Sequence, residues 1–122
     1  MSRRLDRLND LLREEVSALL REVKDPRLVG LVTITRVEVS EDLAHARVFF
    51  SVLGTEEERQ STAQALASAA GFLRRELAHR LTLRRIPELH FVPDVSMERA
   101  GRVLDIMRQL ARERHTPAGE SP

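Results

Sequence analysis

The sequence of 122 residues contains no cysteine, no tryptophan, no tyrosine and only four phenylalanines. Without cysteine the chain forms neither disulfides nor thiolate metal sites, and it is compatible with a reducing compartment. Because aromatic side chains are so scarce, a base-stacking platform like that of RNA-recognition sheets is weakly supported. Only Phe49 is expected on an exposed strand face, so the sequence offers a single candidate for stacking.

Long apolar runs are also missing. No segment approaches the length of a membrane span, and residues 1–6 lead into a charged helix without a signal-peptide core. We therefore expect a cytoplasmic protein with no membrane segment. The hydrophobic content of 42% suffices for the core of one domain, and the net charge is only +1. This balance argues against a protein coated in positive charge.

Motifs for catalysis and metal binding are absent as well. There is no GxSxG, HExxH, Walker-type loop or GxGxxG, and the glutamates 56–58 lie at a predicted helix start, where they complement the dipole. The histidines are scattered over different elements with no paired acid and no metal-ligand spacing, and we expect ordinary surface or strand roles. They are His45, His79, His90 and His115. The sequence therefore predicts no enzymatic activity, no metal and no cofactor.

Hydrophobic periodicity predicts an amphipathic helix from about Arg3 to Val23, which ends before Pro26 because proline cannot continue a helix. Strands are predicted at 31–39 and 42–53, and a third at 87–93. In the second strand, alternate residues form the core face. These are Ala44, Ala46, Val48, Phe50 and Val52.

The first strand contains a change of phase. Val37 and Val39 fit the core layer, whereas Val32 and Ile34 fall on the opposite phase. Two interpretations stay open, a β-bulge or a half-covered second face of the sheet.

After Thr55, which forms a predicted capping box with Glu58, the chain is expected to form two helices. One apolar stripe is centred on Ala63, Leu66, Ala67 and Ala70, and a second on Phe72, Leu73 and Leu77. The two stripes lie roughly 100° apart on a straight helix. We therefore predict an interruption at Ala69-Ala70-Gly71, which lets both halves face one core.

The second of these helices and the loop after it carry the only strongly charged block. Residues 72–86 hold five arginines against the single acid Glu76, a local charge of +4. Arginines on a wet helix face often serve solubility alone. The N-terminus of a new helix, however, has unpaired N–H groups that point outward beside these arginines, and such a place suits phosphate binding. The predicted phosphate ligands are Arg74, Arg75, Arg80, Arg84 and Arg85, with Arg27 and Lys24 extending the track.

The predicted order is helix, strand, strand, helix, interruption, helix, strand, and a last helix at 96–114 that Ser96 caps. This order indicates a two-layer α+β domain whose three-stranded sheet is covered by helices on one face. It matches a type II KH-like domain, although Ala69-Ala70-Gly71 stands where KH domains have a GXXG loop. We expect a KH-like RNA-binding domain at 1–95, a C-terminal helix at 96–114 that docks on or extends it, and a disordered tail at 115–122.

Four segments, in order, carry a family resemblance: residues 24–28 (KDPRL), 37–48 (VEVSEDLAHARV), 69–74 (AAGFLR) and 83–91 (LRRIPELHF). Together they resemble the ribosome-binding factor A family over residues 3–110. Each motif alone is modest, but four in register are specific.

The resemblance implies a non-enzymatic assembly factor that binds the free 30S subunit through 16S rRNA. It also implies a role in late 30S maturation, in processing of the 16S rRNA 5′ end and in growth in the cold. In that family an Ala-x-Gly kink replaces GXXG, so Ala69, Ala70 and Gly71 inherit an RNA-binding role. We expect a monomer, and a functional link to an assembly GTPase stays open.

Two other classes remain as alternatives. A protein–protein module would use Val32, Ile34 or the stripe of the 96–114 helix and would bind at high salt. A DNA-binding regulator would bind duplex DNA tightly, usually as a dimer.

Overall fold

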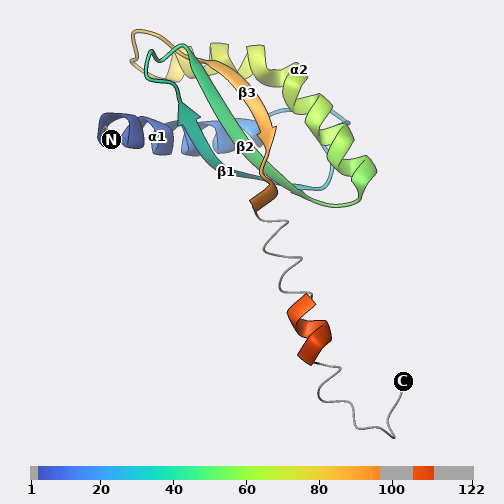
Figure 1. Cartoon of the computed structure of the whole chain (residues 1–122). Coiled ribbons are helices and arrows are strands. Elements are labelled where there is room, and N and C mark those ends of the chain that lie inside the picture. The colour runs from blue at the N-terminus through green and yellow to red at the C-terminus, as the bar shows by residue number, and fades with distance from the viewer. Residues whose placement is uncertain (1–2, 97–105, 112–122) are drawn as a thin grey trace, which may run out of the picture.

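The structure is a computed structural model that describes residues 3–96 and 106–111. Its elements are α1 (Arg3–Leu20), β1 (Leu31–Val39), β2 (His45–Leu53), α2 (Glu56–Arg80) and β3 (Glu88–Pro93), followed by a helical segment at 106–111 (Figure 1). The predicted order of helices and strands is confirmed from α1 to β3, apart from the interruption treated below.

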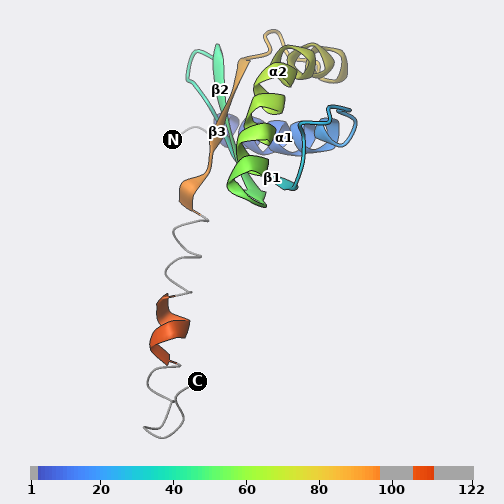
Figure 2. The same ribbon diagram turned by 90° about the vertical axis from the view of Figure 1, so that its right-hand side faces the viewer.

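The three strands form one mixed sheet in the order β1-β2-β3. β1 and β2 make an antiparallel hairpin, whereas β3 runs parallel to β2. A parallel pair needs a crossover connection, which α2 provides. Both helices lie on the same side of the sheet, as predicted, and leave the other face open (Figure 2).

A bulge in β1 decides between the two interpretations of its phase change. Ile34 pairs with Phe50 and Arg36 pairs with Phe49, so Thr35 is an extra residue in the ladder. Ile34 is only 6% exposed and lies in the same core as the later valines of the strand. The first strand therefore has no second apolar face at Ile34.

The core lies between the helices and the sheet. It combines Leu12, Val16 and Leu19 of α1, Leu66, Leu73 and Leu77 of α2, and the inward residues of the strands, among them Ala46, Val48, Phe50 and Leu89. α1 ends at Leu20, three residues before the predicted end, because the next amides bond in i→i−3 fashion: Glu22 N–H donates to Leu19 and Val23 N–H to Leu20.

α2 is one continuous helix of 25 residues, so the predicted interruption at Ala69-Ala70-Gly71 is wrong. Leu66 and Leu73 are both fully buried and lie seven residues apart, about two turns, hence on one stripe. The two apolar stripes were predicted to lie apart because Phe72 was assigned to the core, but Phe72 is 40% exposed. Both views nevertheless show that the axis of α2 changes direction along its length (Figures 1 and 2).

Backbone groups at both ends of α2 form hydrogen bonds with residues that are close in the sequence. The predicted capping box is confirmed, since Glu58 N–H donates to Thr55 Oγ1 at 3.1 Å and Thr55 N–H donates to Glu58 Oε1 at 2.9 Å. At the other end, Leu81 N–H donates to the Leu77 carbonyl. One polar side chain in the core, Thr62, is satisfied by the backbone of Val29 in the α1–β1 loop, with which its hydroxyl exchanges two hydrogen bonds.

The predicted 96–114 helix is described only in part. Asp94 rather than Ser96 acts as the cap, because Asp94 Oδ1 accepts hydrogen bonds from the N–H and the hydroxyl of Ser96. Residues 106–111 are helical, and their apolar side chains Ile106, Met107 and Leu110 are 51–59% exposed. The rest of that helix and the 115–122 tail lie outside the described residues. Within ranges 3–96 and 106–111, no helix has the length and apolar character needed to cross a bilayer.

Candidate nucleic-acid interface

Four of the predicted arginines surround one surface hollow of about 480 Å³. Arg74 and Arg75 come from α2, and Arg84 and Arg85 come from the loop between α2 and β3; all four are exposed. The other lining residues are Ala78, Leu83 and Ile86, so the lining holds four cations and no acid. We call this set of seven residues the arginine hollow.

Arg74 has a structural role in addition to its charge. Its Nε donates a hydrogen bond to the carbonyl oxygen of Ile86 at 3.1 Å. Ile86 is 9% exposed and packs in the core, which anchors the loop at that point. The bond uses Nε alone and leaves the two Nη groups for other acceptors. Arg74 thereby holds Arg84 and Arg85 beside α2.

Arg80 is paired with an acid. Its Nη2 lies 3.0 and 3.2 Å from the two carboxylate oxygens of Glu22, which follows α1. Both side chains are well exposed, so the pair adds little stability. The carboxylate does, however, offset the charge of Arg80, which makes it a weaker candidate for phosphate than the arginines of the hollow.

Arg27 is also paired and lies elsewhere. Its guanidinium bonds both oxygens of Asp25, at 3.2 and 2.8 Å, and this hydrogen bonding lowers the pKa of Asp25 and raises that of Arg27. The Arg27 carbonyl accepts a hydrogen bond from Ser61 Oγ. Ser61 lies 13 residues before Arg74, about 20 Å along a helix. Arg27, and the exposed Lys24 in the same loop, therefore lie beside the first half of α2 rather than at the hollow.

Ala69, Ala70 and Gly71 do not precede a new helix N-terminus as predicted, because all three lie inside α2. Ala69 and Ala70 are partly buried against the core, and Gly71 is exposed. The true N-terminus of α2 carries Glu56, Glu57 and Glu58, which repel anions. Inside a continuous helix the three small residues do not offer the free N–H groups that motivated an RNA-binding role. That role stays a prediction.

The open face of the sheet differs from what the sequence predicts. Phe49 is only 8% exposed, so its predicted role as an exposed stacking residue is wrong. The guanidinium of Arg36 lies 4.0 Å from the ring centroid and that of Arg47 lies 5.8 Å from it, and both arginines pair with Glu38. The bulge at Thr35 decides this arrangement by bringing Arg36 opposite Phe49.

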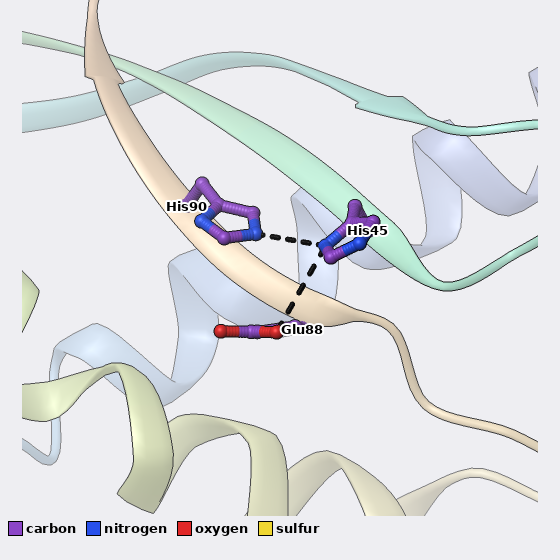
Figure 3. Close-up of side chains that lie close together, drawn as sticks. All are labelled: His45, Glu88 and His90. Carbon is purple, nitrogen blue, oxygen red and sulfur yellow. Dashed lines mark hydrogen bonds and ion pairs between the residues drawn. The ribbon is translucent and has the colours of Figure 1, made fainter.

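The same face corrects the prediction that the histidines have no paired acid and no metal-ligand spacing, although His45 and His90 are exposed strand residues as expected. His45 Nδ1 lies 3.0 Å from His90 Nε2, and Glu88 is beside them (Figure 3). The three residues come from neighbouring parallel strands, and their outward positions in each strand were visible in the sequence. The pairing of β2 with β3 was not visible in the sequence, and this pairing alone brings the three residues together. His79 is exposed on α2, and His115 lies outside the described residues.

Comparison with known proteins decides the relationship. The sequence model of the family described as ribosome-binding factor A matches residues 4–107. The chain belongs to the ribosome-binding factor A family. Ribosome-binding factor A of Thermomicrobium roseum is 50% identical over 114 residues, which cover 93% of this chain and 88% of that protein.

Solved structures of the ribosome-binding factor A family agree with the fold. The crystal structure of the factor from Thermus thermophilus superposes with a TM-score of 0.65 at 29% identity, over 73% of this chain and 93% of that one. Coordinates of the T. thermophilus factor, a homology model fitted into the cryo-EM map of a 30S–RbfA complex, give a TM-score of 0.56 at 31% identity over 79% of this chain and 97% of that one.

Proposed function

We propose that this protein is a cytoplasmic, monomeric assembly factor that binds the free 30S subunit through 16S rRNA. Its role is to promote late 30S maturation and processing of the 16S rRNA 5′ end, with particular importance in the cold. Membership of the ribosome-binding factor A family supports this proposal, as does the T. thermophilus factor placed in a 30S complex. As a member of that family it acts without enzymatic chemistry.

The arginine hollow is the observation that carries the binding mode. Arg74, Arg75, Arg84 and Arg85 converge on it with no acid in the lining, so together they attract phosphates of a folded RNA. Guanidinium groups contact phosphate in bidentate fashion, and such contacts position a protein without reading sequence. Specificity therefore comes from the shape of the immature subunit, against which the apolar lining residues add complementary surface.

The remaining predicted contacts belong to the edge of this interface. Lys24 and Arg27 provide a second, weaker positive area beside the first half of α2, and Arg80 becomes available where rRNA displaces Glu22. Ala69, Ala70 and Gly71 lie on α2 between the two areas and let the RNA backbone approach, since they have no large side chains. A functional link to an assembly GTPase stays a prediction.

Co-sedimentation with separated 30S and 50S subunits across a salt series tests the proposal. We expect the protein with 30S particles only, with affinity that falls steeply as salt rises. Binding that persists at high salt, and that is lost when Ile106, Met107 and Leu110 are made polar, indicates a protein–protein module instead. Tight binding of duplex DNA by a dimer indicates a regulator. The protein–protein alternative has already lost one predicted surface, since Ile34 lies in the core.

A further inference from the structure

The open face of the sheet carries a group of three metal-ligating side chains from two neighbouring strands. His45 lies at the start of β2, and Glu88 and His90 lie on β3. In the parallel ladder His45 is opposite Glu88, and His90 is one outward position further along β3. Figure 3 shows the two imidazoles turned toward each other with the carboxylate beside them.

The distances fit one coordination sphere. His45 Nδ1 lies 3.0 Å from His90 Nε2 and 3.9 Å from Glu88 Oε2, and one ligand atom from each residue lies within 4.8 Å of the others. Two nitrogens bound to a tetrahedral Zn²⁺ at about 2.0–2.1 Å lie roughly 3.3 Å apart. The imidazoles are thus already close to the required separation, and the exposed Glu88 side chain has only a short distance to turn.

We propose that His45, Glu88 and His90 bind a divalent transition-metal ion of the zinc class. Two imidazoles and a carboxylate suit Zn²⁺, Ni²⁺ or Co²⁺, whereas Mg²⁺ and Ca²⁺ prefer all-oxygen sites. Without the ion, one imidazole N–H donates to the other ring. When the ion binds, the donating ring moves its proton to its other nitrogen, so that both neutral imidazoles present a lone pair to the metal.

The surrounding charges permit a cation here. Arg47 is opposite His90 in the ladder, but Arg47 Nη2 lies 2.8 Å from Glu38, whose carboxylate is shared with Arg36 and offsets the arginine charge in part. On the other side, Asp42 lies close enough to His45 to interact with it electrostatically. Both His45 and Glu88 have more than half of their side-chain surface exposed. The site is accordingly open to entry, and it leaves at least one coordination position to water.

A bound ion has a structural consequence. β3 is an edge strand and pairs only with β2 within the described part of the chain. An ion held by His45 and His90 joins these two strands by side chains in addition to the backbone ladder. This inference is independent of 30S binding, because the arginine hollow contributes none of the three ligands.

The test uses the full chain without a histidine tag. Co²⁺ is titrated into the protein while its visible d–d bands are recorded, and Zn²⁺ affinity is then measured by displacement of Co²⁺. We expect one site per chain, with the intense bands of a four-coordinate ion. His45→Ala and His90→Ala should each weaken binding by roughly tenfold or more, because loss of a ligand costs at least as much as loss of a residue that supports one. Glu88→Gln should weaken it less.

His79→Ala is the matched control, since it removes an exposed imidazole of α2 that lies outside the group. Equal loss of binding in the control, unchanged affinity in both His45→Ala and His90→Ala, or no d–d bands in the wild-type protein overturns the proposal. Far-UV circular dichroism shows whether each variant is folded. If His45→Ala or His90→Ala unfolds, the Co²⁺-induced shifts of histidine ring protons in the wild-type NMR spectrum decide, and shifts that spare His45 and His90 overturn the proposal.

Discussion

Arg74 on α2 donates its Nε–H to the carbonyl oxygen of Ile86, 12 residues further along the chain, at 3.1 Å. The bond joins the helix to the loop that carries two further arginines of the hollow. A side chain that binds RNA in our proposal therefore also builds the surface on which the RNA lies.

Arg74→Ala should lower the free energy of unfolding by about 1 kcal/mol, because it leaves the partly buried Ile86 carbonyl without this donor. Arg75→Ala is the matched control: it removes the same charge from the next residue, and a change within about 0.5 kcal/mol is expected for a surface site. Urea unfolding followed by circular dichroism measures both. If the two variants prove equally stable, the hydrogen bond does not hold the loop.

Arg84→Ala/Arg85→Ala should weaken 30S binding and reduce its dependence on salt. If each side chain holds one phosphate, the slope of log K against log salt decreases by roughly 1.4 to 1.8 units, since each contact contributes about 0.7–0.9. Arg7→Ala/Arg13→Ala, on the exposed face of α1, changes the net charge equally and should keep the slope. If the slope is the same in both double variants, Arg84 and Arg85 do not contact phosphates of the rRNA.

Gly71→Ala should stabilise the protein by about 0.5–1 kcal/mol, because alanine favours the helix interior over glycine. A Cβ at position 71 meets only Arg75 Nη1, at 3.5 Å, which is ordinary contact. Gly30→Ala offers the contrast: Gly30 has φ +77°, and a Cβ there lies 3.1 Å from Val52 Cγ1 and 3.2 Å from the Leu53 carbonyl. We expect this variant to lose about 1–2 kcal/mol. Thermal unfolding compares the two, and a destabilised Gly71→Ala would mean that the bend of α2 needs glycine.

Asp94 should make stability depend on pH in the acid range. Hydrogen bonds from Ser96 and Thr35 lower the pKa of this buried carboxyl below its ordinary value of 3.8. A carboxyl with a lowered folded-state pKa contributes stability above its unfolded pKa, and this contribution is lost as the pH falls through the folded value. Asp94→Asn should therefore flatten the decline in urea stability below about pH 4, and Thr35→Val should flatten it in part. A decline as steep as that of the wild type in Asp94→Asn would assign acid sensitivity to other carboxyls.

Local patterns account for the features that the sequence predicted correctly. Alternation in β2 identified Ala46, Val48 and Phe50 as core residues, and the Thr55–Glu58 spacing identified the start of α2. The concentration of arginines at 74–85 likewise identified four residues that the fold places around one hollow. Each of these depends on residues close together in the chain, so periodicity and composition suffice.

The errors concern relationships between distant residues. The helical period assigned Phe72 to the core face of α2, yet Phe72 is exposed. Which face of α2 meets the sheet depends on the neighbours that pack against the helix. Phe49 was expected to be open, yet a bulge across the hairpin places Arg36 over its ring.

The sequence by itself determined the order of the elements from α1 to β3, the core face of β2 and the local excess of arginine, because these follow from backbone preference and hydrophobic spacing. Only the tertiary structure decided that α2 is continuous, that Arg80 meets Glu22, and that His45 lies beside His90. The physical reason is that such pairs depend on strand register and helix packing, which are set by the burial of the whole core at once.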